Sequence, residues 1–216
     1  MSLYIWLITI ALMGILMQVC FNQRDYYKNE ARALTVKAIC TLVPVSICLY
    51  GIIKTGAPVT TWILFAGLCI CLTADVVIGI HFVAGMLVFL CAHLCFITYF
   101  LTLAPLKGHS IVLFALLYAL VVKGFWKFVP TLGNRVVPFT VYPAVLMIMF
   151  SIAMMLPFAL GSVGSVLLAV GAGLFAISDV ILAGNTLGDF SKVKDRVVLY
   201  LYYPAVYLLA VSVFYM

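Results

Sequence analysis

Long apolar runs separated by short polar connections dominate this sequence. Most runs are about 20 residues long, the length at which an α-helix spans the hydrocarbon core of a bilayer. Within a bilayer, such a run satisfies its own backbone polar groups only as a helix. The pattern therefore predicts an all-α integral membrane protein with eight transmembrane helices. They are expected near residues 2–20, 33–53, 59–79, 82–104, 110–128, 138–157, 161–182 and 196–215.

The connections between the runs contain residues that end helices. Proline and glycine occur together in the segments 54–58, 105–108 and 130–135, and two glycines bound the segment 184–188. The first run lacks a basic leading segment and a small-residue cleavage site, so we expect it to be a retained helix. No linker or low-complexity stretch interrupts the series. We therefore expect a single polytopic domain over residues 1–216.

A short pattern occurs in both halves of the chain. Residues 67–79 and 171–184 each carry an aspartate, Asp75 or Asp179, within an apolar run, followed by branched aliphatic residues and a glycine. Each aspartate belongs to the third helix of a four-helix half. We therefore expect two parallel repeats, 1–108 and 109–216, related by an axis along the membrane normal. Such symmetry would bring both carboxyl groups to a central polar cavity.

Composition supports the membrane assignment and charge orients it. Hydrophobic residues make up 67% of the chain and charged residues 8%, with a mean hydropathy of +1.30, values that exclude an ordinary soluble domain. Basic residues gather around the loops after the first, fifth and seventh helices, whereas the opposite face has only Lys54 and Lys107. The basic set is Arg24, Lys28, Arg32, Lys123, Lys127, Arg135, Lys192, Lys194 and Arg196.

The basic face is expected to be cytoplasmic, with both termini on the other side. Asp75 and Asp179 lie near the ends of two helices that run toward the basic face, so both should lie near the cytoplasmic interface. The net charge of +6 then reflects topology and contact with lipid headgroups, and no nucleic-acid partner is expected. The membrane would be the endoplasmic reticulum in a eukaryote and the inner membrane in a bacterium. The oligomeric state is left open.

The two aspartates are the main candidates for catalysis. A carboxylate inside a membrane helix costs roughly 2.5–3.5 kcal/mol on insertion scales, so its presence favours a functional role. The alternative is that each caps a helix end or pairs with an interfacial lysine, but the helix dipole disfavours an anion at a helix C-terminus. Two acids in one low-dielectric pocket tend to share a proton, which suits general acid and base work.

Several other polar residues are candidates for supporting roles. Lys37, one turn inside the second helix, either reaches the basic face or binds an anion. His93, in the fourth helix, is either a hydrogen-bonding packing residue or part of the site. The tyrosines around Pro204 are either interfacial residues or hydroxyl donors to a polar pocket. The supporting candidates are Lys37, His93, Tyr99, Tyr202 and Tyr203.

No metal or cofactor is expected. All seven cysteines lie in or beside apolar runs, and the pairs Cys69 with Cys71 and Cys91 with Cys95 lack the loop ligands that usually accompany soft-metal sites. The sequence also lacks a nucleophile elbow, a phosphate-binding loop and a zinc-protease motif. A serine esterase, an NTPase and a zinc protease are therefore disfavoured.

Short motifs in a fixed order along nearly the whole chain resemble the YhhN-like lysoplasmalogenase family of multi-pass membrane proteins. They comprise Lys37, the segment 66–69, Ala74 with Asp75, the segments 92–94 and 97–100, the segment 173–179, and Tyr202 with Tyr203. The resemblance implies hydrolysis of the vinyl ether bond of a lysoplasmalogen, a lysophospholipid. The products would be a fatty aldehyde and glycerophosphoethanolamine or glycerophosphocholine.

The implied chemistry agrees with the residues found above. Protonating a vinyl ether carbon produces an oxocarbenium ion, which a nearby carboxylate stabilises while it activates water. Asp75 and Asp179 would divide these roles, and the supporting residues would orient the headgroup and water. Two alternatives remain: a proton-coupled transporter of a small solute or lipid, which paired intramembrane acids also suit, and a structural membrane protein.

Overall fold

The computed structural model describes residues 3–133, 136–187 and 193–216. Within these ranges, eight helices are long and apolar enough to cross a membrane, and no strand is present, which confirms the predicted fold class. The helices are α1 (Leu3–Phe21), α2 (Glu30–Thr55), α3 (Thr61–Ile80), α4 (Phe82–Leu103), α5 (Gly108–Phe125), α6 (Val136–Ala153), the short α7 (Leu156–Leu160), α8 (Val163–Thr186) and α9 (Val193–Val211).

Shorter helical turns join or extend some of these helices. A π-helical turn, η1 (Asn22–Tyr26), follows α1, and 3-10 turns extend α5 (η2, Trp126–Thr131) and α9 (η4, Ser212–Tyr215). The expected helix at 138–157 ends earlier, at Ala153, and is followed by α7. Pro157 explains the break, because it has no N–H to donate to the carbonyl of Ala153 and its ring disfavours helical backbone before it.

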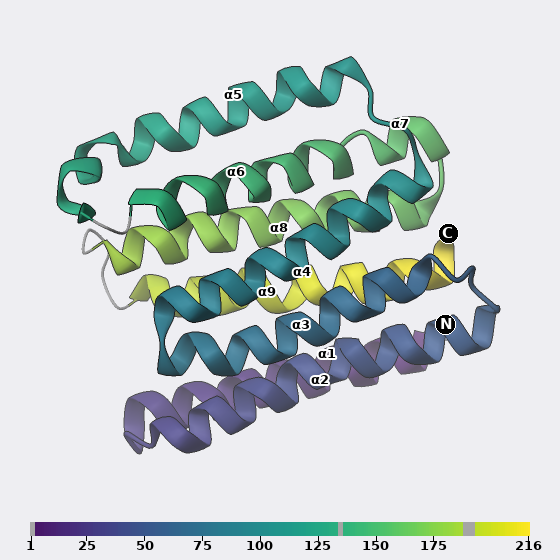
Figure 1. The fold of residues 1–216 in the computed structure, drawn as a ribbon. Helices are drawn as coiled ribbons and strands as arrows, with labels where there is room; N and C mark the ends of the chain where they lie inside the picture. Colours follow the sequence, from purple (N-terminus) through teal and green to yellow (C-terminus); the bar gives the residue numbers. More distant parts are fainter. Residues whose placement is uncertain (1–2, 134–135, 188–192) are drawn as a thin grey trace.

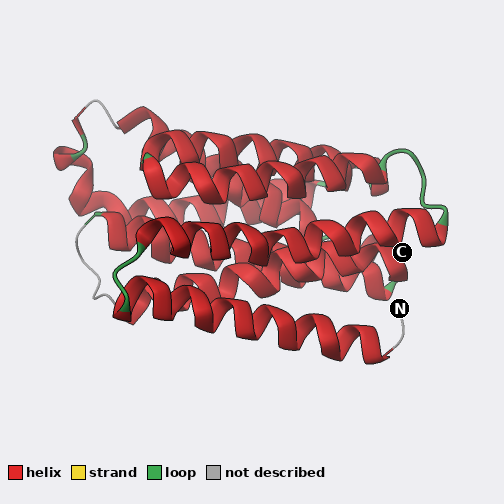
Figure 2. Cartoon of the chain, turned by 90° about the horizontal axis from the view of Figure 1, so that it is seen from below, coloured by secondary structure: helices red, strands yellow, loops and turns green. Residues whose placement is uncertain are grey.

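The long helices run alongside one another and form a bundle, with both chain termini at the same end (Figures 1 and 2). The other end carries η1, the tight turn at His81 between α3 and α4, and the start of α9. It also carries the basic residues of the described ranges, whereas Lys54 and Lys107 lie at the end with the termini. Arg135 and Lys192 lie outside the described residues. This distribution matches the expected charge asymmetry.

Helix α9 lies at the centre of the bundle and α5 at its edge (Figure 1). Helix α9 packs against α1, α2, α3 and α8, and most of its apolar side chains from Val198 onward are buried. Helix α5 packs mainly against α6, and Ser110 is its one buried residue. In water such an exposed apolar helix would be costly, so its outer face indicates contact with lipid.

The two halves of the bundle make corresponding helix contacts. In each half, successive long helices pack side by side: α1 on α2, α2 on α3 and α3 on α4, then α5 on α6, α6 on α8 and α8 on α9. Across the halves, α4 packs on α6 and α9 packs on α2, which a twofold relation would interchange. These contacts are those that parallel repeats would give, and the repeat itself stays a prediction.

The tight turn at His81 depends on a glycine in α4. A Cβ atom added at Gly85 would overlap the backbone of Ile78 on α3, so the two helices touch through backbone at this level. Gly85→Ala is expected to destabilise the protein by roughly 1–3 kcal/mol, because α3 and α4 must move apart. Reversible unfolding in mixed detergent micelles measures the change.

Gly14 in α1 is the matched control, since a Cβ atom there meets nothing within 4 Å. Gly14→Ala should leave the free energy of unfolding unchanged or slightly higher, because alanine is the better helix former. Equal stability of the Gly85→Ala and Gly14→Ala variants would contradict the close helix approach.

Candidate active site

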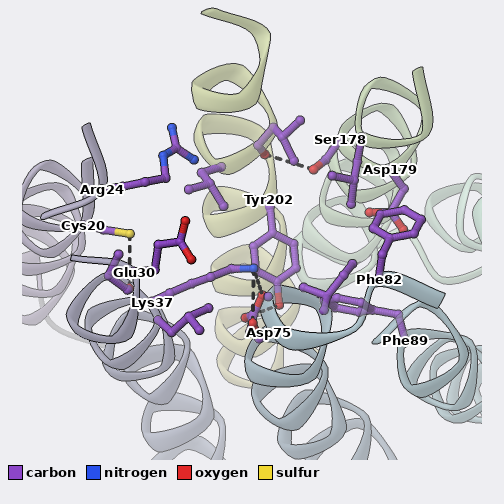
Figure 3. A pocket seen from close by; sticks show the side chains of 17 residues that line it. Cys20, Arg24, Glu30, Lys37, Asp75, Phe82, Phe89, Ser178, Asp179 and Tyr202 are labelled. Carbon is purple, nitrogen blue, oxygen red and sulfur yellow. Dashed lines mark hydrogen bonds and ion pairs between the residues drawn. The ribbon is translucent and has the colours of Figure 1, made fainter. Parts of the chain in front are cut away.

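A cavity of about 370 Å³ opens among α2, α3, α8 and α9 near the basic end of the bundle (Figure 3). Asp75 lies five residues before the end of α3 and Asp179 seven before the end of α8, so both are about 8–10 Å along the helix from that end. Both aspartates line this cavity. Both aspartates thus lie at similar distances from the basic ends of their helices and share one cavity.

Asp75 is buried and has several hydrogen-bonding and ionic partners. Its side chain is 1% exposed, and its Oδ1 lies 3.0 Å from the Lys37 ammonium on α2. The Oδ2 atom accepts hydrogen bonds from the Thr41 hydroxyl, one turn beyond Lys37, and from the Tyr202 hydroxyl at 2.8 Å. An ammonium and two hydroxyls together offset the cost of burying a carboxylate. Lys37 thus points into the bundle instead of reaching the basic face.

A tyrosine and a histidine are the partners of Asp179 among the described residues. Its Oδ2 accepts a close hydrogen bond from the Tyr142 hydroxyl on α6, and the Nε2 of His93 lies 3.9 Å from the same oxygen. No lysine or arginine of the described ranges lies within ion-pair distance of this carboxyl. Because an unpaired charge is costly to bury, this environment favours a neutral carboxylic acid.

His93 is held by packing instead of by a strong hydrogen bond. The residue is fully buried, and its ring lies edge-on to Phe175 and Tyr142, with centroids 4.9 Å and 5.4 Å away. Nε2 has no hydrogen-bond partner within the described residues. The ring therefore presents a free nitrogen toward Asp179, in a position to relay a proton or to bind a water molecule.

The partners of the two aspartates correspond between the halves. Each aspartate contacts the preceding helix of its own half, through Lys37 or Tyr142, and the last helix of the other half, through Tyr202 or His93. Sequence reasoning missed Thr41 and Tyr142. Thr41 follows Lys37 by one helical turn, and Tyr142 precedes Asp179 by 37 residues, nearly the 38 that separate Lys37 from Asp75. Both spacings were available in the sequence.

The two remaining candidates lie outside the cavity. Tyr203 is buried beside the site, and its hydroxyl donates to the backbone carbonyl of Lys37 at 3.4 Å, which supports α2 from behind. Tyr99 is buried at the other end of the bundle, where its hydroxyl interacts with Thr61 at the start of α3. Asp75 follows Thr61 by 14 residues, about 20 Å along α3. The structure therefore does not bring Tyr99 to the aspartates.

A cluster of charged and aromatic side chains lies at the basic end of the bundle, beside the cavity. Asp25 in η1 accepts hydrogen bonds from Arg196 at the start of α9, at 2.6 Å and 3.0 Å, and from Arg24 at 3.0 Å. The guanidinium groups of Arg24 and Arg196 lie 5.8 Å and 5.5 Å from the ring centre of Phe21. These contacts tie α1 to α9 and fix Arg24, which lines the cavity.

A second space, an apolar groove, lies beside Asp179. It runs between α5, η2, α6 and α8, encloses about 70 Å³, and is lined almost entirely by aliphatic and aromatic side chains. Asp179 lines both the groove and the polar cavity. The carboxyl group of Asp179 therefore lies at a boundary between polar and apolar space.

The arrangement provides one charged and one uncharged carboxyl environment in a single cavity, which is the requirement for paired general acid and base catalysis. In the described part of the chain, no three His, Cys, Asp or Glu residues come together in a group that could hold a metal ion. The carboxyl groups, the lysine and the tyrosines that do come together are side chains able to donate or accept protons.

Comparison with known proteins identifies a family. Residues 32–213 match the model of the YhhN family, which covers most of the chain and includes both aspartates and their contacts. The match confirms the family inferred from the sequence motifs. No curated protein and no solved structure gave a match.

Proposed function

The chain belongs to the YhhN family, and on that premise we propose that it is a lysoplasmalogenase. The reaction is hydrolysis of the vinyl ether bond of a lysoplasmalogen to a fatty aldehyde and a glycerophosphoethanolamine or glycerophosphocholine. The supporting observation is the pair of intramembrane carboxyl groups in one cavity, of which, among the described residues, only Asp75 has a lysine or arginine partner. Vinyl ether hydrolysis needs an acid and a base at once, and this pair supplies them.

Asp179 is the proposed general acid and Asp75 the proposed general base. Asp179 is hydrogen-bonded by Tyr142 and has no lysine or arginine beside it in the described part of the chain, so the neutral acid is the favoured form. Asp75 is stabilised as a carboxylate by Lys37, Thr41 and Tyr202. These three donors leave part of its acceptor capacity for a water molecule.

The steps balance without a covalent intermediate. Asp179 protonates the vinyl carbon remote from oxygen, which leaves an oxocarbenium ion at the carbon that bears oxygen. Water adds to this carbon as Asp75 takes its proton, and a hemiacetal forms. Asp179 then accepts the hydroxyl proton of the hemiacetal, while Asp75 returns its proton to the departing glycerol oxygen. The aldehyde leaves, and both carboxyl groups recover their starting states.

The proposed orientation of the lipid follows from the polarity of the spaces around Asp179. The glycerophospho headgroup occupies the polar cavity below the basic rim, and the alkenyl chain extends into the apolar groove between α5, α6 and α8. Asp179 lines both spaces, so the vinyl ether lies beside its carboxyl group. The exposed position of α5 leaves this groove close to the surrounding lipid. By the positive-inside rule, we place the basic rim in the cytoplasm.

The purified protein in detergent is expected to release aldehyde from lysoplasmenylethanolamine or lysoplasmenylcholine with no ion gradient present. Coupling to an aldehyde dehydrogenase and recording NADH absorbance measures the rate. The saturated 1-alkyl lysolipids are the control substrates, because they lack the vinyl carbon that must be protonated. Failure of a folded preparation to release aldehyde, together with solute or lipid uptake in sealed proteoliposomes, would contradict the hydrolase and favour a transporter.

A further inference from the structure

The cavity is lined by an arginine, Arg24, that is held in place by Asp25 and still has hydrogen-bond donors without a partner in the described part of the chain. Arg24 lines the cavity, and its Nε donates to Asp25 at 3.0 Å, while Asp25 is itself bound by Arg196. The terminal nitrogens of Arg24 make no hydrogen bond within the described part of the chain. A guanidinium group with free terminal N–H groups is well suited to bind a phosphate through two parallel hydrogen bonds.

The same rim carries an unpaired carboxylate. Glu30, the first residue of α2, lines the cavity and forms no hydrogen bond or ion pair through its side chain among the described residues. Figure 3 shows Arg24, Glu30 and Lys37 on the same side of the cavity. Glu30 precedes Lys37 by seven residues, about 10 Å along α2 toward the rim. A guanidinium group with unused terminal N–H groups and a carboxylate without a partner among the described residues therefore line the same cavity as the aspartates.

We propose that Arg24 and Glu30 form a headgroup site that selects zwitterionic lysolipids, with Arg24 binding the phosphate and Glu30 binding the ammonium group. This inference rests on the proposed function for the identity of the lipid. An anionic headgroup would meet Glu30 with a like charge and be disfavoured.

Binding of saturated 1-alkyl lysolipids tests the site without turnover. Isothermal titration in detergent compares phosphoethanolamine and phosphocholine headgroups with the anionic phosphoglycerol headgroup. Glu30→Gln is expected to weaken binding of the two zwitterionic lipids roughly tenfold and to leave phosphoglycerol binding unchanged or tighter. Arg24→Gln is expected to weaken all three roughly tenfold. Arg32→Gln, an exposed charge change outside the cavity lining, is the control and should leave all three unchanged.

The outcomes separate this inference from the proposed function. Equal effects of Glu30→Gln on zwitterionic and anionic lipids would overturn the headgroup site, even if the wild-type protein releases aldehyde. Headgroup discrimination that is lost in Glu30→Gln, in a protein that releases no aldehyde from any vinyl ether lysolipid, would support the headgroup site and overturn the hydrolase. Identical affinities of the wild-type and Arg24→Gln proteins for all three lipids would show that Arg24 does not bind the phosphate.

Discussion

Replacing Asp179 by asparagine is expected to lower kcat for aldehyde release by a factor of roughly 10²–10⁴, the usual contribution of a general acid. Asparagine keeps the shape of the side chain and an oxygen that accepts the Tyr142 hydroxyl, but it has no proton acidic enough for the vinyl carbon. The measurement is the initial rate with saturating lysoplasmenylethanolamine, beside the binding constant of the 1-alkyl analogue.

The binding constant is the control that separates chemistry from folding. Asp179→Asn should bind the 1-alkyl lysolipid as the wild type does, because the headgroup contacts proposed for Arg24 and Glu30 are untouched. Its thermal unfolding should also be close to that of the wild type, since the hydrogen bond from Tyr142 remains possible. Full activity in a folded Asp179→Asn variant would contradict the role of this residue as the acid.

Removing the ammonium group of Lys37 is expected to destabilise the protein by roughly 3 kcal/mol, because Asp75 is then buried without its cation. Lys37→Met keeps most of the side-chain volume, so the change isolates the charge. The double variant Lys37→Met with Asp75→Asn should recover most of the lost stability, since no unpaired carboxylate remains. The free energies of unfolding of the wild type, the two single variants and the double variant, measured by reversible unfolding in mixed micelles, complete the double-mutant cycle.

The same four proteins also report on catalysis. Every variant that lacks the Asp75 carboxylate should remain inactive even where stability returns, because the proposed base is missing. Lys54→Met is the matched control, since Lys54 is exposed near the opposite end of the same helix. It should change neither stability nor rate. Additive effects of Lys37→Met and Asp75→Asn would show that the ion pair has no energetic coupling.

Much of the fold was predictable because a bilayer imposes a simple rule on sequence. Apolar runs of the right length must be helices, so their number and approximate positions follow from hydropathy alone. Helix ends were less predictable. Pro44, Pro143 and Pro204 lie inside continuous helices, whereas Pro157 coincides with a break. A helix continues through a proline where neighbouring helices compensate for the missing backbone hydrogen bond, and it breaks where they do not. This compensation depends on packing, which the sequence alone does not show.

The candidate site was predictable where intramembrane charge singled out a residue. Asp75, Asp179 and Lys37 stand out because each is costly in an apolar helix, and the fold places all three around one cavity. Tyr142 did not stand out, because a tyrosine in a membrane helix has many ordinary explanations. Tyr99 was placed with the site because it lies in segment 97–100, one of the segments that resemble the family, but the helical rise of α4 carries it toward the other end.

The difference between the two aspartates came only from the structure. Their sequence surroundings are nearly alike, and each lies in the third long helix of its half. Their contacts differ because α2 presents a lysine to Asp75, whereas α6 presents a tyrosine to Asp179. This difference in contacts underlies the proposed division into base and acid, and only the packing of the helices reveals it.

The most direct test of the account is the isotopic composition of the aldehyde formed by purified protein from a lysoplasmalogen in D₂O. Proton transfer from Asp179 to the vinyl carbon predicts one deuterium on the carbon next to the aldehyde group, read by mass spectrometry after rapid reduction to the alcohol. Unlabelled aldehyde incubated with the protein in D₂O corrects for exchange. Aldehyde without this deuterium, or no aldehyde from folded protein, would contradict vinyl ether protonation by the buried acid.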